Sequence, residues 1–379
     1  METGSKNSNP TAITLMRVVH LSYVSNPQYT DPQSWLNRID FFTGILEASC
    51  TYGPVDSVHC IGYSGVLDHH DVAYHFFRKT RLQLLFPYTL HTYIKNLSPD
   101  VVIVHSLNFP QNILLLRWQL GSKVRIVVQH HAEKPLRYFK RLFQRAADRF
   151  IYAYLFTARD IGMDWFDQRL ICDRSKIKEV METSTSLYPI EREKARVVTN
   201  VEGNPVYLWV GRLNNNKDPL TVVQAFLRFS ENHRGAKLYM IYQTEELLTD
   251  IGAILRENNE GGRSVHLIGK VEHDKVIDWF SSADFYISAS HYEGGGVALT
   301  EAMACGCIPI VSSIPSFNAM TGGGQCGLTF QPSNANELYE SFLKSTRINV
   351  KQEKEMTLTF FKNRLSFMAI AKTIYSYLV

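Results

Sequence analysis

The sequence predicts an α/β protein of two domains, each a parallel sheet covered by helices. Its 379 residues exceed what one hydrophobic core normally organises. Apolar stretches of strand length alternate with helical patterns in two series, which the polar stretch 174–204 separates. The second series includes a strand, a glycine loop and a helix in succession at 287–311, an arrangement typical of ligand-binding α/β domains.

The composition is that of a soluble globular protein. Apolar residues make up 45% and charged residues 20% of the chain, which excludes a disordered protein, and the net charge of +4 indicates no nucleic-acid partner. No apolar run has membrane-spanning length, and the N-terminus lacks the hydrophobic block of a secretion signal. The six cysteines show no metal-type spacing and predict buried thiols of a reducing compartment. We therefore expect a cytoplasmic protein.

The first series begins with a predicted strand at 16–24. A helix follows, with Asp31 as its N-cap and Pro32 at its first position. Further apolar strands are predicted at 55–63, 100–106 and 124–130. Helical patterns separate these strands, as in a parallel sheet with crossover helices.

The second series follows the stretch 174–204, which we interpret as the inter-domain connection, with room for a short strand. Its apolar strands are predicted at 205–213, 236–243, 264–271, 283–290 and 308–313. Helical patterns again lie between them. The final stretch, 353–379, predicts one or two helices.

The glycine loop predicts an anion site. Gly294, Gly295 and Gly296 leave room for a ligand to approach the backbone. A helix is expected to begin near Val297, so that the amides of Gly296, Val297 and Ala298 would be unpaired donors for anionic oxygens.

Two carboxylates flank this loop. Glu293 precedes it directly and Glu301 lies one turn into the expected helix. Because a carboxylate repels phosphate, each is expected to face a neutral group rich in hydroxyls, such as a ribose or a sugar. The combination predicts a nucleotide-sugar site.

These glutamates, with seven residues between them and the run EAMACG at 301–306, resemble the Glu-x7-Glu motif of retaining glycosyltransferases of family 4. That family has the GT-B fold, in which two Rossmann-like domains face each other across a cleft and a C-terminal helix crosses back. The resemblance, strongest over 205–330, implies the following domains: an N-terminal acceptor-side domain at 1–182, a linker at 183–204, a nucleotide-sugar-binding domain at 205–355, and a returning helix at 356–379.

Two cations follow the first strand of the second series. Arg212 and Lys217 stand where positive charge can neutralise a diphosphate, and their spacing resembles the GR-x4-K pattern of the family. A solvated basic loop is the alternative. The resemblance implies that both side chains stabilise the departing nucleoside diphosphate. It also implies that the backbone of Gly269, Lys270 and Val271 contacts the base.

The family pattern further implies roles around the glycine loop. Glu301 would bind the ribose hydroxyls, and Glu293 would bind a hydroxyl of the transferred sugar. The amides that would hold sugar and phosphate are those of Gly295, Gly296, Val297 and Ala298.

The first domain offers two adjacent histidines at the end of a predicted strand. Adjacent residues on a strand point to opposite faces, so only one of them can face the cleft. The family usually has a histidine here, and His131 aligns with it. His131 is therefore the expected catalytic residue, and His130 the buried structural one.

The stretch 134–150 mixes basic and apolar residues at helical spacing. It predicts peripheral contact with an anionic membrane or a phosphorylated acceptor. The alternative is a surface helix with one face in the core. On the first reading, the cytoplasmic protein would lie at the inner face of the membrane.

We expect no metal and no cofactor beyond the nucleotide-sugar itself. No Asp-x-Asp motif for a metal–diphosphate complex is present, and the two cations and the helix start would replace the metal. One acidic and histidine-rich group resembles a metal site, but its neighbours are aromatic and no partner cluster occurs elsewhere, so we expect no metal there. It comprises Asp68, His69, His70, Asp71 and His75.

The sequence thus predicts a retaining, metal-independent glycosyltransferase that acts by front-face substitution. Its donor would be a UDP- or GDP-sugar, and its acceptor a saccharide or lipid-linked hydroxyl in polysaccharide, glycolipid or glycoconjugate biosynthesis. The loop after the first strand, 22–33, lacks the glycine pair common in the family. This departure leaves open a non-catalytic nucleotide-sugar-binding partner. A nucleotide-sugar epimerase is a second alternative, because such enzymes share the two-domain architecture.

Overall fold

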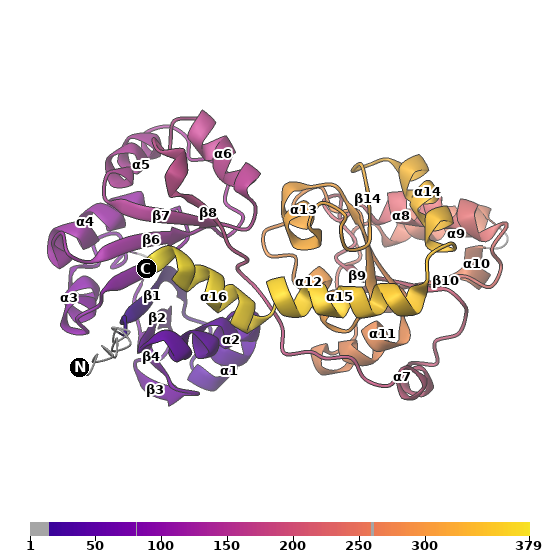
Figure 1. Cartoon of the computed structure of the whole chain (residues 1–379), viewed down its shortest axis with the longest axis horizontal. Coiled ribbons are helices and arrows are strands. Elements are labelled where there is room, and N and C mark those ends of the chain that lie inside the picture. Colours follow the sequence, from indigo (N-terminus) through magenta and orange to yellow (C-terminus); the bar gives the residue numbers. More distant parts are fainter. Residues whose placement is uncertain (1–14, 81, 259–260) are drawn as a thin grey trace, which may run out of the picture.

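The computed structural model describes residues 15–80, 82–258 and 261–379 and divides into two sheet-containing domains (Figure 1). The N-terminus, where no secretion signal is expected, lies outside the described residues. Among the helices of the described residues, none is both long enough and apolar enough to cross a bilayer.

The N-terminal domain is built on an eight-stranded sheet of order β3-β4-β2-β1-β5-β6-β7-β8, in which only the β3–β4 pairing is antiparallel. Its strands are β1 (Val18–Asn26), β2 (Val55–Ile61), β3 (Gly65–His69), β4 (Val72–Phe77), β5 (Val101–His105), β6 (Arg125–Gln129), β7 (Ile151–Phe156) and β8 (Ile177–Glu179). Its helices are α1 (Pro32–Arg38), α2 (Asp40–Ser49), α3 (Tyr88–Asn96), α4 (Pro110–Leu120), α5 (Lys140–Asp148) and α6 (Arg159–Asp167).

Several predicted features of this domain are confirmed. Asp31 caps α1 by accepting a hydrogen bond from the Ser34 amide at 2.7 Å, and Pro32 opens the helix. Strands β1, β2, β5 and β6 coincide with the four predicted apolar stretches. They are buried along most of their length, which explains why they read as apolar runs.

Two parts of this domain were not predicted. Residues 65–77 form the hairpin β3–β4, whose tight turn places His70 and Asp71 at positive φ angles of 49° and 65°. Strand β7 was also missed, since its apolar residues continue the periodic pattern of the preceding basic stretch.

The C-terminal domain contains a six-stranded parallel sheet of order β11-β10-β9-β12-β13-β14. Its strands are β9 (Val206–Gly211), β10 (Lys237–Tyr242), β11 (Val265–Gly269), β12 (Phe285–Ser288), β13 (Ile308–Ser312) and β14 (Leu328–Phe330). Its helices are α8 (Pro219–Ser230), α9 (Leu248–Glu257), α10 (Gly261–Ser264), α11 (Val276–Ser282), α12 (Val297–Ala304), α13 (Pro315–Thr321) and α14 (Ala335–Ser345), and α7 (Arg192–Thr199) precedes the sheet in the connection.

The last two helices link the domains. Helix α15 (Val350–Arg364) lies along the C-terminal domain, and α16 (Phe367–Leu378) lies on the N-terminal domain (Figure 1). In α16, Ile370, Ile374 and Leu378 are buried in a cluster with Val18 of β1 and Val101 of β5. The chain therefore crosses back to its first domain.

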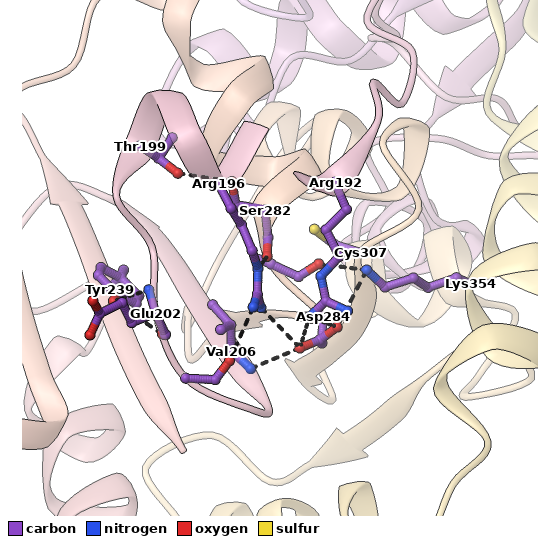
Figure 2. A network of polar contacts seen from close by, with 12 residues as sticks. Arg192, Arg196, Thr199, Glu202, Val206, Tyr239, Ser282, Asp284, Cys307 and Lys354 are labelled. Atoms are coloured by element: carbon purple, nitrogen blue, oxygen red, sulfur yellow. Dashed lines mark hydrogen bonds and ion pairs between the residues drawn. The ribbon is translucent and has the colours of Figure 1, made fainter. Parts of the chain in front are cut away.

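A buried carboxylate fixes the connection to the second sheet, as Figure 2 shows. Asp284 is 2% exposed and precedes β12. It forms ion pairs with Arg192 at 2.7 Å and Lys354 at 3.5 Å, and it accepts a hydrogen bond from the Val206 amide at 2.9 Å. Because Asp284 lies at the amino ends of β9 and β12, this network stands at the opposite edge of the sheet from the predicted ligand loops.

Candidate active site

The glycine loop and the cationic loop lie together at the carboxyl ends of β12 and β9. The amide of His291 donates to the carbonyl of Asn216 at 2.8 Å, and the Asn216 side chain donates to the carbonyl of Tyr292 at 3.0 Å. Lys217 forms an ion pair with Glu293. Both side chains are largely buried, so the charge of Lys217 is already matched by a carboxylate. The guanidinium of Arg212 is exposed and makes no contact of this kind with the described residues.

The start of α12 provides unpaired amide donors, as predicted from its sequence. Gly296 is the N-cap, with φ 56° and ψ 46°, and it has no side chain to accept a hydrogen bond. The first amides of the helix, those of Val297 and Ala298, therefore have neither an intrahelical partner nor a side-chain cap. Such a helix start favours an anion.

The other glycines of the loop face protein. A Cβ atom on Gly294 would meet Glu182 at 2.6 Å and Ala132 at 2.9 Å, and one on Gly295 would meet Thr183 at 2.5 Å. The Thr183 hydroxyl also donates to the Gly295 carbonyl at 2.8 Å. These glycines therefore allow the first domain and the connection to approach the loop closely.

The second glutamate of the motif lies between the domains. Glu301 is 5% exposed and accepts a hydrogen bond from His273 at 2.8 Å. This hydrogen bond raises the pKa of His273, although partial burial opposes the shift. Glu301 lines a cavity of about 110 Å³ that also receives hydroxyls from the connection and residues of α2. The hydroxyl-bearing residues are Ser184, Thr185 and Ser186.

The third predicted segment lies at the end of β11. Gly269 has φ 84°, and the position of its missing Cβ is open, so the backbone there is accessible. Lys270 pairs with Glu272 at 3.2 Å, but both side chains are well exposed, and such a pair contributes little to stability. Val271 packs at the edge of a core cluster.

The two adjacent histidines point in opposite directions. His130 is buried against Phe156, and burial lowers its pKa. His131 is 35% exposed and forms an ion pair with Glu182. Burial lowers the pKa of His131, but the charge and hydrogen bond of Glu182, with help from Glu133, outweigh it, so the pKa is raised.

His131 also begins a chain of imidazoles. Its Nε2 contacts Nδ1 of His105 at 2.8 Å, and Nε2 of His105 contacts Nδ1 of His20 at 3.1 Å. Burial lowers the pKa of His105 and brings that of His20 to about 3, so both are neutral near pH 7. A protonated His131 can donate along this chain, and a neutral one can accept along it. Both ring nitrogens of His131 are thus occupied, which a sequence motif could not indicate.

Residues 191–357 match the family model described as glycosyl transferases group 1. These residues form a group 1 glycosyltransferase domain. The family assignment confirms the predicted enzyme class, whereas membership of family 4 and the retaining mechanism stay predictions.

Two relatives of this glycosyltransferase are bacterial enzymes. One, from Campylobacter jejuni, is named N-acetylgalactosamine-N,N'-diacetylbacillosaminyl-diphospho-undecaprenol 4-alpha-N-acetylgalactosaminyltransferase, and is 23% identical over 65% of this chain and 67% of its own length. Another, the GDP-mannose:cellobiosyl-diphosphopolyprenol alpha-mannosyltransferase of Xanthomonas campestris, is 25% identical over 58% of this chain and 57% of its own length. The alignments therefore span between about half and two thirds of these relatives.

Solved structures match the glycosyltransferase over nearly its whole length. A glycosyltransferase from Rickettsia africae superimposes with a TM-score of 0.71 at 16% identity, covering 96% of this chain and 98% of that one. Sucrose-phosphate synthase from Thermosynechococcus elongatus gives a TM-score of 0.67 at 15% identity, with the same coverage. An Anabaena protein in complex with UDP and glucose gives 0.64 at 14% identity, covering 96% and 99%. These likenesses confirm the predicted GT-B fold.

The sequence did not indicate three side chains of the glycosyltransferase site. Glu182 stands in a polar stretch without a motif, yet it contacts both His131 and the glycine loop. His105 is the last residue of β5 and His273 lies shortly after β11, and this position at a strand end is the one signal that could have indicated them. Their partners come from distant parts of the chain.

Proposed function

We propose that this glycosyltransferase moves a sugar from a UDP- or GDP-sugar to a hydroxyl of a saccharide or lipid-linked acceptor, with retention of configuration. One observation carries the proposal: an uncapped helix start, a Lys–Glu ion pair and a His–Glu ion pair lie around the same glycine loop. These groups supply amides that donate hydrogen bonds to an anion, a cation, and carboxylates that accept hydrogen bonds from hydroxyls. A nucleotide-sugar requires all three.

The donor type is supported by relatives. A fold neighbour from Anabaena was solved with UDP and glucose, and the Xanthomonas relative is named for GDP-mannose. In this chain, Glu301 would bind the ribose hydroxyls, and the accessible backbone of Gly269 to Val271 would contact the base. The amides from Gly295 to Ala298 would hold sugar and phosphate.

Lys217 and Glu293 would change partners when the donor binds. The diphosphate attracts Lys217, which frees Glu293 to accept a hydrogen bond from a sugar hydroxyl. Arg212, whose guanidinium is uncommitted, would add a second cation. The two cations and the helix start would stabilise the charge that develops as the glycosidic bond breaks, without a metal.

The proposed transfer is a front-face substitution. The bond between the sugar C1 and the diphosphate oxygen breaks, and the acceptor oxygen bonds to C1 on the same face. The acceptor proton passes to the departing diphosphate oxygen. His131, whose pKa Glu182 raises, would contribute positive charge beside the loop when protonated, and it would have to release His105 before it could donate to a sugar hydroxyl.

The names of the two relatives and the exposed surface of the stretch 134–150 support the proposed acceptor and its cellular setting. Both bacterial relatives are named for diphosphopolyprenol-linked acceptors. The stretch 134–150 exposes basic and apolar side chains, which suits peripheral contact with an anionic membrane at its cytoplasmic face. Polysaccharide or glycolipid biosynthesis is the corresponding setting.

A donor panel tests the function. UDP-, GDP-, ADP- and TDP-sugars are incubated with wild type and with Glu301→Ala, with and without EDTA, and release of nucleoside diphosphate is measured. Slow hydrolysis of one donor, abolished in the variant and unaffected by EDTA, is expected. Formation of an isomeric nucleotide-sugar would indicate an epimerase instead, and failure to bind any nucleotide would refute the proposal.

A further inference from the structure

Helix α5 buries polar side chains and exposes apolar ones. Gln144 and Asp148 are 1% and 3% exposed, and both bond to the Tyr154 hydroxyl, at 3.0 Å and 2.9 Å. Leu142 and Phe143, in contrast, are 67% and 42% exposed. Ala147 of this helix is buried in the core, but the packing of the domain does not account for Leu142 and Phe143. Clustered exposed apolar side chains mark an interaction site.

These side chains border a groove of about 760 Å³, a volume typical of small-molecule sites. Its walls come from the end of β1, the loop between β5 and α4, the segment before α3, and the helices α4 and α5. Most of its lining is apolar and includes Tyr23, Leu84, Phe109, Leu114, Leu115 and Phe143. At its mouth, Phe86 and Phe139 are 78% and 66% exposed.

The groove continues into the predicted acceptor side of the cleft. Val24 and Asn108 line both the groove and a second pocket of about 380 Å³, which contains His105 and His131. The two cavities lie at the carboxyl ends of β1 and β5, where the strand order of the sheet reverses. Open α/β sheets bind ligands at this point.

The adjoining pocket of His105 and His131 contains the carboxylate of Glu133, whereas the charged lining of the groove itself is cationic. Lys140 lines it, and no carboxylate does so among the described residues. The neighbouring Arg141 and Arg145 are held by backbone carbonyls of residues 168 and 169, which leaves Lys140 as the exposed cation at this wall.

We propose that this groove binds the hydrocarbon chain of an amphiphilic acceptor, whose polar head points toward the pocket of His105 and His131. The inference rests on the proposed transfer function and narrows its acceptor to the lipid-linked class. A concave, walled groove suits a single chain, whereas a bilayer surface would contact the outward-facing Leu142, which does not line it.

Calorimetric titration of the whole protein with decyl phosphate tests whether the groove binds a hydrocarbon chain. The decyl phosphate is kept below its critical micelle concentration. Wild type should bind decyl phosphate and should not bind glycerol phosphate, which has the charge without the chain. Phe143→Asp should weaken binding by about tenfold or more, because it places a charge in the apolar lining. Phe150→Asp is the matched control, since Phe150 is equally exposed, at 42%, but lies outside the groove.

Other results would overturn the proposal. Equal weakening in Phe143→Asp and Phe150→Asp, or no binding of decyl phosphate, would exclude a chain in the groove. Binding to anionic phosphatidylglycerol vesicles alone, lost in Leu142→Asp, would assign the surface to the bilayer. Should Phe143→Asp fail to fold, Phe86→Asp at the exposed mouth replaces it, with the same loss expected.

The donor panel separates this inference from the proposed function. Donor turnover without decyl phosphate binding would overturn the groove and leave the transferase standing. If the protein binds decyl phosphate but no nucleotide, the groove remains a site for a hydrocarbon chain. The proposed transferase function, and with it the role of the chain as part of an acceptor, would then be overturned.

Discussion

Replacing Lys217 by alanine is the most direct test of how the glycine loop acts. The lysine is 25% exposed and its partner Glu293 is 13% exposed, so neither charge is fully screened by water. Loss of one preorganised group that stabilises developing charge typically lowers kcat by about 10²–10³-fold, or about 3–4 kcal/mol. The variant also leaves Glu293 without a cation beside the diphosphate, which places the expected loss at the upper end of this range.

Nucleotide affinity should change much less. Lys217 is expected to act most strongly when the glycosidic bond breaks, so the Kd for the nucleoside diphosphate should rise by less than about tenfold. The assay compares release of nucleoside diphosphate from the active donor with calorimetric Kd. Lys194→Ala is the control, because Lys194 pairs with Glu191 on the surface, where such pairs contribute little.

The ion pair of Lys217 and Glu293 predicts that the effects of substituting its two residues on turnover are coupled. Glu293→Gln, made in the Lys217→Ala background, removes the unpaired carboxylate and should restore part of the lost rate, with a coupling energy of about 1 kcal/mol or more. Equal losses of turnover and of nucleotide affinity in Lys217→Ala, or strictly additive effects of the two changes, would refute this role.

Three further predictions concern stability, pH and the loop. Asp284→Ala should destabilise the C-terminal domain by about 2–3 kcal/mol, below the cost of a fully buried pair, because the cations that it leaves unpaired, Arg192 and Lys354, are 34% and 23% exposed. The Tm should fall by roughly 5–10 °C, whereas Glu272→Ala, in a surface pair, should leave the Tm unchanged within error. Glu182→Gln removes the charge that raises the pKa of His131, so this histidine should lose its proton at lower pH. The alkaline limb of the pH–rate profile should then move to lower pH. If neither this limb nor the NMR titration of His131 moves, the proposed role of Glu182 is contradicted. Gly296→Ala should weaken donor binding and lower the Tm. The substitution forces a φ of 56° on a residue with a side chain, and its Cβ would lie 2.9 Å from the sulfur of Met320. Unchanged donor affinity would count against the helix start as the anion site.

Local features of this protein could be read from its sequence. The N-cap at Asp31, the buried strands β5 and β6 and the helix start at Gly296 depend on residues a few positions apart. Capping, burial and the conformational freedom of glycine act over that range, so the pattern is present in the chain itself.

The orientation of α5 could not be read in the same way. Its pattern allowed a helix with its apolar face in the core, but the structure buries Gln144 and Asp148 instead. Their polar atoms are satisfied by the Tyr154 hydroxyl on β7, a strand that the sequence did not predict. A helix pattern shows that two faces differ but does not show which one meets the core.

By itself, therefore, the sequence determined the two-domain α/β class, the positions of most strands along the chain and the residues of the glycine loop. Tertiary structure alone decided which groups meet there. Glu182 lies in the polar connection, and it reaches His131 and Gly294 because the chain returns between the two sheets. Such contacts join residues about fifty or more positions apart, and their energies depend on burial and distance, which exist only once both domains have folded.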